Sequence, residues 1–279
     1  MLLMNHLPYD QTTTLFSPWN YYARSHINEW SKPHEMAFNQ ISIIIPVWNA
    51  MEYTTQCLTS IFENSRFQSE IIVVDNGSHD GTSQWLKSLG TKVRVHSNLK
   101  NLGFAKACNQ GAKVATNNIL VFLNNDTVVT PGWDYLLLRP FLSSPHPGLI
   151  GPRACNVSGP QNVQASYKNL SELNEFSLKW THEHFGLWQP IPRLVGFCLA
   201  THKKDFWAVD GFSEEYEIGN YEDDDLCAKY RANGKELLVL HDTYIHHFGQ
   251  RTFLSNDIDY TASMNKNRKI FEKKWARNG

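Results

Sequence analysis

The sequence of 279 residues predicts an α/β fold whose central sheet is mostly parallel and Rossmann-like, with helices on both faces. Short apolar runs rich in β-branched residues alternate with segments whose apolar residues recur at helical spacing. The runs lack polar alternation, which is typical of strands that are covered on both faces. Because strand and helix alternate regularly, we expect crossover connections between parallel strands.

The regular pattern begins at Ile41 and loosens near residue 145. In its first part we predict, in order, strand 41–45, a helix around 53–62, strand 71–74, helix 82–89, strand 93–96, helix 104–115 and strand 119–123. Later we predict strand 194–201, helices 203–209 and 222–232, strand 237–240 and a final helix 257–275. Residues 1–39 are polar and aromatic without a clear period, and we expect an extension that packs on the main domain or binds a partner.

Composition excludes several classes of function. The chain has 26 Lys and Arg against 27 Asp and Glu, so no overall basic field attracts nucleic acid. The five cysteines are widely separated and form no metal-type pair, which favours a reducing compartment. We find no apolar run long enough to span a membrane and no secretory signal, and we therefore expect a cytoplasmic protein.

Acidic residues stand where an open α/β sheet binds ligands, beyond the carboxyl ends of its strands. Asp75 directly follows one predicted strand, and Asp126 follows another through Asn124 and Asn125. Either aspartate could instead serve a turn. Four successive carboxylates, residues 222–225, begin a predicted helix, and helix capping explains one or two of them. Repulsion within this cluster should raise some of its pKa values, which suits a general base.

Adjacent histidines, His246 and His247, follow the last predicted strand by six residues. Imidazole is a common ligand of divalent ions, although most histidines are structural or solvated. Neighbouring side chains on an extended segment point to opposite faces, so we expect at most one of the two to serve a site. The glycine-containing stretches match neither the dinucleotide fingerprint nor a P-loop, and no nucleophile elbow occurs.

Taken in order, these features resemble a family 2 glycosyltransferase with the GT-A fold. The matching segments are Ile43-Ile-Ile-Pro-Val-Trp-Asn49, Ile72-Val-Val-Asp-Asn-Gly-Ser78, Asn101-Leu-Gly-Phe-Ala-Lys-Ala-Cys-Asn109, Leu123-Asn-Asn-Asp-Thr127, Gly196-Phe-Cys-Leu-Ala200, Asp210-Gly-Phe-Ser213, Tyr221-Glu-Asp-Asp-Asp-Leu226 and His246-His-Phe-Gly249. Each motif alone is weak, but together they follow the order of the family. The resemblance covers about residues 41–253.

The resemblance implies a role for each candidate residue. It implies that the nucleotide sugar is bound by residues at the ends of the first two predicted strands and in the Asn-X-Asp motif. These residues are Pro46, Val47, Asn49, Asp75, Asn124, Asn125 and Asp126. Asp126 and His247 would hold a metal ion, with His246 as the alternative to His247, and Asp223 would be the catalytic base. Candidates ranked lower are Glu222, Asp225, Arg251 and Lys106. One departure is Asn124, since the family usually carries Asp there and an amide is a weaker ligand than a carboxylate.

The implied activity is inverting transfer of a sugar from a nucleotide sugar to an acceptor hydroxyl, assisted by Mg²⁺ or Mn²⁺. The default donor is a UDP-sugar, with dTDP- and GDP-sugars open, and the acceptor would be a glycan or a lipid-linked glycan. The implied domain is 40–253, with a donor-binding half at 40–127 and an acceptor-binding, catalytic half at 128–253. The alternatives are a degenerate relative that only binds nucleotide or glycan, and a sugar-phosphate nucleotidyltransferase.

The near-zero net charge conceals a separation of charges. Acids gather between residues 214 and 225, and bases gather in the last predicted helix. That helix, within a C-terminal segment of residues 254–279, could lie on an anionic membrane surface or could present an ordinary solvated face. The tyrosines and tryptophans between residues 167 and 221 could include a platform on which a sugar stacks.

Overall fold

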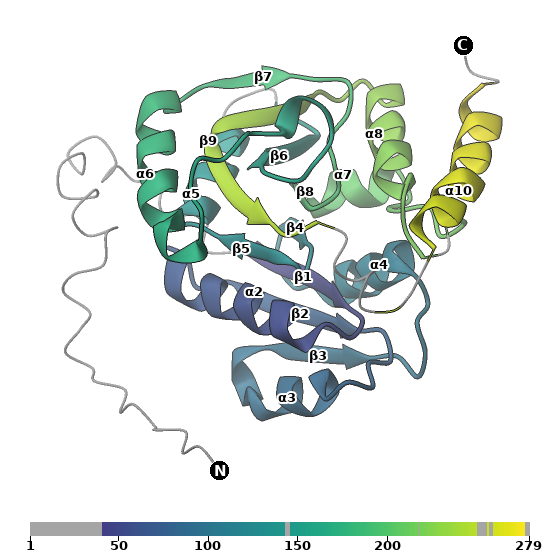
Figure 1. The fold of residues 1–279 in the computed structure, drawn as a ribbon. Helices are drawn as coiled ribbons and strands as arrows, with labels where there is room; N and C mark the ends of the chain where they lie inside the picture. The colour runs from purple at the N-terminus through teal and green to yellow at the C-terminus, as the bar shows by residue number, and fades with distance from the viewer. Residues whose placement is uncertain (1–40, 143–145, 217, 250–255, 257–258, 277–279) are drawn as a thin grey trace.

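A computed structural model describes residues 41–142, 146–216, 218–249, 256 and 259–276. A sheet of nine strands runs through this part of the chain, in the order β3-β2-β1-β4-β8-β6-β9-β5, and β7 pairs with β9 off this path. The predicted α/β fold is confirmed, with helices packed against both faces of the sheet (Figure 1). The two predicted halves share this one sheet.

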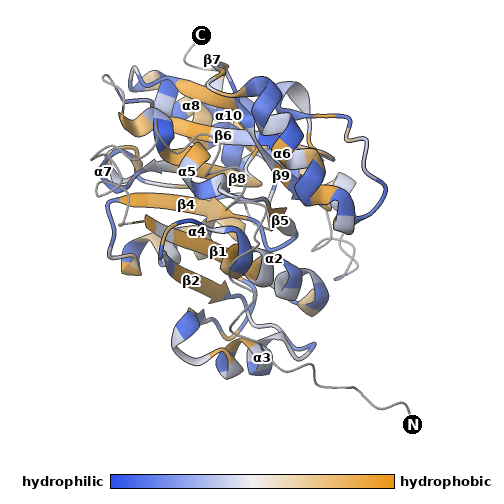
Figure 2. Cartoon of the chain, turned by 90° about the vertical axis from the view of Figure 1, so that its left-hand side faces the viewer, coloured by the Kyte–Doolittle hydropathy of each residue, from blue (hydrophilic) through white to orange (hydrophobic). Residues whose placement is uncertain are grey.

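The first half of the chain forms the parallel part of the sheet. Its four strands are β1 (Ile41–Val47), β2 (Glu70–Asp75), β3 (Arg94–Ser97) and β4 (Ile119–Leu123), and each pairs in parallel with its neighbour. The helices between them are α2 (Met51–Asn64), α3 (Thr82–Ser88) and α4 (Phe104–Val114). The central strands are mostly apolar, whereas the helices carry mixed surfaces (Figure 2).

Alternation along β1 divides the core into two layers. Ile41, Ile43 and Ile45 belong to the cluster that includes α2 and α3 side chains. Ile44 belongs to the opposite cluster, with α4, α7 and α8. All four isoleucines are at most 1% exposed, so each face of the strand contributes about 1.5–3 kcal/mol per buried side chain. This burial on both faces is why the strand needs no polar alternation.

The second half of the chain adds strands in both directions. It contains β5 (Thr127–Val129), β6 (Leu149–Ala154), β7 (Trp188–Pro190), β8 (Cys198–His202) and β9 (Leu237–His247). β8 pairs antiparallel with β4, and β9 pairs parallel with β6 and antiparallel with β5 and β7. The helices are α5 (Trp133–Leu138), α6 (Leu173–His184), α7 (Lys203–Ala208), α8 (Glu222–Ala232) and α10 (Tyr260–Trp275).

Short 3₁₀ turns complete the described elements, at Gly90–Lys92, Arg139–Leu142, Gly159–Gln161 and Leu170–Glu172. In Figure 1, α10 lies beside α8 at one end of the molecule. No described helix is both long and apolar enough to cross a membrane.

The last strand differs from its prediction. The sequence predicts strand 237–240 with the two histidines six residues beyond it, but β9 continues through both of them. His241 and Asp242 interrupt the apolar pattern, yet Asp242 is fully buried because Arg139 pairs with it at 2.5 Å. The extension places the two histidines on a paired strand, so their side chains leave opposite faces as expected.

Candidate active site

A cavity of about 760 Å³ opens beyond the carboxyl ends of β1 and β4. The chain passes from β1 to β2 and β3 on one side and then returns to β4 on the other, so this edge is the topological switch point where open α/β sheets bind ligands. Pro46 and Val47 line the cavity from β1, and residues 124–126 line it from the turn after β4. The first turn of α8, the end of β9 and the first turns of α10 also line it, together with residues 156–158, 195–197 and 218–221.

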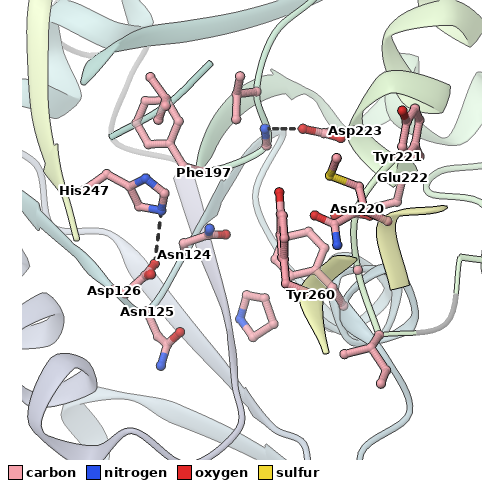
Figure 3. Close-up of a pocket in the computed structure, with 18 of the residues that line it drawn as sticks. Asn124, Asn125, Asp126, Phe197, Asn220, Tyr221, Glu222, Asp223, His247 and Tyr260 are labelled. Carbon is pink, nitrogen blue, oxygen red and sulfur yellow. Dashed lines mark hydrogen bonds and ion pairs between the residues drawn. The ribbon is translucent and has the colours of Figure 1, made fainter. Parts of the chain in front are cut away.

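Asp126 and His247 meet on one side of the cavity (Figure 3). Pairing of β5 with β9 sets Thr127 opposite His247, and the preceding aspartate therefore faces the same imidazole. The Asp126 carboxylate lies 3.3 Å from Nε2 of His247, and both residues are at least nine-tenths buried. Neither ring nitrogen of His247 makes a hydrogen bond. The fold thus brings one of the two adjacent histidines to the Asn-X-Asp motif.

The two asparagines of the motif have different surroundings. Asn125 donates from Nδ2 to the Thr54 hydroxyl at 2.9 Å, which ties the motif to α2. The backbone N–H of Asn124 donates to the Phe197 carbonyl at 2.9 Å, while its side-chain oxygen is buried without a hydrogen-bond partner. A buried, unsatisfied oxygen is costly, and this one lines the cavity, so it is available to a ligand there.

Asp223 lies on another wall of the cavity, in the first turn of α8. One carboxylate oxygen accepts the Gly196 N–H at 2.8 Å, and the other accepts the Asp224 N–H at 2.9 Å. A Cβ added to Gly196 would lie 2.9 Å from the Cβ of Asp223, so a glycine is required for this approach. The two backbone donors fix the carboxylate while it remains a cavity-lining group (Figure 3).

Two carboxylates of the acidic cluster have raised pKa values, and burial contributes more to both shifts than the repulsion that the sequence predicts. Burial, followed by the negative charge of Asp223, raises the pKa of Glu222 well above its usual value. Burial and the same neighbouring charge raise the pKa of Asp224 to about 6, although the Arg193 guanidinium opposes the shift. Both shifts favour the protonated form of the carboxyl group, so they oppose the accumulation of negative charge in the first turn of α8.

Asn49 and Asp75 are not among the residues that line the cavity, although both stand at strand ends beside it. Asn49 accepts the His79 N–H at 2.8 Å, and its own N–H donates to the Ser78 hydroxyl at 2.7 Å. Asp75 accepts the Ser78 N–H at 2.9 Å and the Ser83 hydroxyl. Both side chains thus order the loop after β2, which borders the cavity.

The lower-ranked candidates separate in the structure. Glu222 lines the cavity, whereas Asp225 is fully buried away from it. His246 leaves the opposite face of β9, where its Nδ1 lies 2.5 Å from the Tyr167 hydroxyl and 3.3 Å from the Cys155 sulfur. Lys106 pairs with Glu214 at 3.8 Å and lines a second hollow elsewhere. Arg251 lies outside the described residues, as does the extension 1–39.

Several cavity residues escaped prediction. Arg193 lines the cavity and pairs with Asp224, but a single arginine between a proline and a leucine carries no sequence signal. Tyr260 and Met264 reach the cavity from α10, which the sequence suggests only as a basic helix. Of the six aromatic residues considered for sugar stacking, Tyr221 lines the cavity. The other five are not among the residues that line it: Tyr167, Trp180, Trp188, Trp207 and Tyr216.

Comparison with known proteins decides the family. The profile of glycosyl transferase family 2 matches residues 42–209. The chain belongs to glycosyl transferase family 2. The matched region of this family 2 chain contains the end of β1, the Asn124–Asp126 motif and Gly196. A second profile, the N-terminal domain of galactosyltransferase, matches residues 177–250, which contain Asp223 and His247.

Individual relatives are distant from this family 2 chain. An uncharacterized glycosyltransferase of Rickettsia bellii is 32% identical over 88 residues, which are 31% of this chain and 13% of the relative. Glycosyltransferase AglE of Haloferax volcanii is 34% identical over 101 residues, 33% of this chain and 32% of the relative. The chain thus spans a third or less of the length of these curated relatives.

Solved structures share the fold. GalNAc-T7 with UDP, GalNAc and Mn²⁺ superposes with a TM-score of 0.59 at 15% identity, over 75% of this chain and 43% of that one. Staphylococcus aureus TarS 1–349 gives 0.56 at 21%, over 75% and 60%. The mannosyltransferase PcManGT of Pyrobaculum calidifontis, in complex with GDP-Man and Mn²⁺, gives 0.54 at 19%, over 81% and 63%. These likenesses confirm a GT-A glycosyltransferase fold.

Proposed function

We propose that this family 2 chain is an inverting, metal-assisted glycosyltransferase that moves a sugar from a nucleotide sugar to an acceptor hydroxyl. The observation that carries the proposal is the arrangement of the cavity: Asp126 and His247 together on one wall, and the buried carboxylate of Asp223 on another. A donor diphosphate held at the first wall would leave its sugar between the two groups. Family membership supports the same activity.

The residues of the first wall fit a divalent cation. Carboxylate oxygen and imidazole nitrogen are both accepted ligands of Mn²⁺, and carboxylate oxygen suits Mg²⁺. Their separation of 3.3 Å is close to the ~3 Å between adjacent ligands of an octahedral ion. No group of three or more histidine, cysteine or acidic side chains in the described ranges could hold a metal. We therefore expect donor phosphate oxygens and water to complete the shell.

The donor would enter with its nucleotide toward Pro46 and Val47, at the end of β1. A UDP-sugar remains our first choice, and solved relatives in this fold were crystallised with UDP and with UDP-GlcNAc. PcManGT was crystallised with GDP-Man, so GDP-sugars belong among the donors to be tested. Asn124 supports the donor through its unsatisfied side-chain oxygen, which can accept a hydroxyl or a metal-bound water.

The chain's own groups would perform the transfer in one displacement. A bound divalent ion would supply Lewis-acid stabilisation of the negative charge on the departing diphosphate. Asp223 would take the proton of the acceptor hydroxyl as that oxygen forms its bond to the anomeric carbon, and the bond to the diphosphate oxygen breaks on the opposite side. General-base help of this kind is worth about 10²–10⁴-fold in rate. A single in-line displacement inverts the anomeric centre.

The alternatives have less support from the site. A protein that only binds nucleotide or glycan would have no use for a buried Asp223 that two backbone N–H groups hold at the cavity. A sugar-phosphate nucleotidyltransferase would carry a glycine- and arginine-rich loop after its first strand, where this chain has Pro46-Val-Trp-Asn49. Both therefore rank below the glycosyltransferase proposal.

A panel of nucleotide sugars tests the proposed function. With Mn²⁺ or Mg²⁺ present, we expect the protein to release nucleoside diphosphate from at least one UDP-, GDP- or dTDP-sugar, and we expect EDTA to stop the release. Coupled detection of the nucleoside diphosphate gives the rate, and boiled protein gives the background. Binding of donors with no release of nucleoside diphosphate, even with pooled glycan acceptors, would favour the binding-protein alternative.

Contact with an anionic membrane surface remains a prediction for α10. Four of its basic side chains, Lys266, Arg268, Lys269 and Lys273, are exposed, whereas the partly buried Lys274 pairs with Asp225 and Glu215. Each exposed base near an anionic surface would contribute about 1 kcal/mol. We expect sedimentation with phosphatidylglycerol vesicles and none with phosphatidylcholine vesicles. If the same fraction of the protein sediments with both kinds of vesicle, α10 makes no specific contact with an anionic surface and presents an ordinary solvated face.

A further inference from the structure

The C-terminal helix α10 is anchored to α8 through a buried carboxylate. Asp225 is fully buried, and its Oδ1 accepts the indole N–H of Trp275 at 2.8 Å. The Lys274 ammonium lies 2.9 Å from the same oxygen. Buried carboxylates require partners of this kind, so the end of α10 is fixed against the helix that carries Asp223. Figure 1 shows the two helices side by side.

A second point of attachment lies nearer the cavity. Asn267 is the buried residue of α10, at 1% exposure. Its Nδ2 donates to the Gly219 carbonyl at 2.8 Å and to the Asn220 carbonyl at 3.1 Å. Ser263, one helical turn earlier, donates to the Gly219 carbonyl at 3.3 Å. One face of α10 therefore satisfies the backbone carbonyls of the segment that leads into α8.

That segment includes a backbone conformation that tyrosine rarely adopts. Asn220 and Tyr221 have φ values of 78° and 71°, in the left-handed region. Asparagine tolerates this region better than most residues, but an aromatic residue tolerates it poorly, so surrounding contacts must hold the conformation of Tyr221. Tyr221 is also the N-cap residue of α8 and makes no side-chain cap. The conformation of this turn consequently sets the direction in which the next residues, Glu222 and Asp223, enter the cavity.

We propose that Asn267 is a positioning residue for the reaction, which holds the strained turn 219–221 and through it the carboxylate of Asp223. The proposal rests on the proposed function, since it assigns Asp223 the part of the base. Asn267 does not line the cavity, whereas Asn220 and Tyr221 do. The two hydrogen bonds of Asn267 go to the carbonyls of Gly219 and Asn220, the two residues before Tyr221. Figure 3 shows Asn220 and Tyr221 at the cavity, together with Tyr260 of α10.

The variant Asn267→Leu tests the proposal, because leucine keeps a comparable volume and removes both hydrogen-bond donors. We expect kcat to fall by about tenfold or more, since small displacements of a reacting group cost up to about 10²-fold. The donor Kd, measured by calorimetry, should change by less than about twofold, because donor binding depends on the opposite wall. Arg268→Ala is the matched control: it removes an exposed pair with Glu272 on the same helix and should leave both values unchanged.

Hydrogen exchange of the backbone supplies a readout that needs no activity. In Asn267→Leu, amides 219–225 should exchange about tenfold faster than in the wild type, and the amides of β1 and β4 should not. Asn220→Gly added to Asn267→Leu should restore part of kcat, because glycine adopts the left-handed turn without strain. If the leucine variant does not fold, Asn267→Ser, which retains one donor, is measured in the same way.

The outcomes separate this proposal from the proposed function. Suppose that the wild type transfers sugar, and that the folded variant at position 267 keeps the kcat and the hydrogen exchange of the wild type. This result would overturn the positioning role of Asn267 and leave the proposed function intact. A wild type without transferase activity would overturn the function, and exchange at 219–225 would still decide whether Asn267 holds the turn. An equal loss of donor affinity and kcat would show a general structural defect and would also overturn the proposal.

Discussion

Asp223→Asn is expected to abolish sugar transfer while leaving donor affinity nearly intact. The amide has the shape of the carboxylate but cannot take a proton, so the rate should fall by about 10²–10⁴-fold. The wall that would bind the donor diphosphate, at Asp126 and His247, is untouched by the change. Calorimetry with the donor and Mn²⁺ should therefore give a Kd within about threefold of the wild type.

A matched control separates loss of the base from a change of fold. Asp205→Asn makes the same chemical change on α7, where Asp205 pairs with Lys235 at 3.2 Å outside the cavity. It should transfer sugar at the wild-type rate. Turnover by Asp223→Asn at the wild-type rate would remove Asp223 from the mechanism, and loss of donor binding in that variant would show that it contributes to the donor site instead.

Asp126→Ala is expected to remove the metal dependence of nucleotide binding. It deletes the carboxylate that lies 3.3 Å from His247 and leaves the imidazole as the remaining protein ligand of that pair. Since disturbing even an outer-shell partner of a metal ligand typically costs about 10–100-fold, we expect at least this loss in affinity for nucleoside diphosphate with Mn²⁺. Without a metal, wild type and variant should bind the nucleotide equally weakly.

Calorimetry with and without Mn²⁺ checks this second expectation, and His247→Ala should behave in the same way as Asp126→Ala. Asp205→Asn again serves as the control and should keep the difference between the two conditions. If Mn²⁺ leaves the affinity of the wild type unchanged, or if Asp126→Ala keeps the full metal effect, the pair at 3.3 Å has another role.

The first half of the fold could be predicted because its strands are uninterrupted. Ile41–Val47 and Ile119–Leu123 are buried on both faces, and Ser42 is the single polar residue in these two strands, so their apolar runs stand out in the sequence. The second half mixes short strands and helices, and some of its buried polar residues pair with residues that are far away in the sequence. Asp242 reads as a break in an apolar run, yet Arg139, 103 positions earlier, pairs with it and lets β9 continue. Nothing local in the sequence indicates that partner.

The candidate site was predicted in part for the same reason. Asp126, His247 and Asp223 all line the cavity. They could be named from the sequence because each lies in a motif of the resemblance. Asp225 belongs to the same acidic run, but its position in the helix turns it away from the cavity and toward α10. Asn267 carries no motif, and its contacts with the turn before α8 depend on how α10 packs. Such contacts need the structure.

The anomeric configuration of the released sugar shows whether this protein transfers sugar by a single inverting displacement. With Mn²⁺ and a donor that the panel identifies, proton NMR follows the sugar at early times, before mutarotation, with water or an added glycan as acceptor. We expect the first product to have the configuration opposite to that of the donor, and Asp223→Asn to give no such signal. A first product with retained configuration would contradict this expectation.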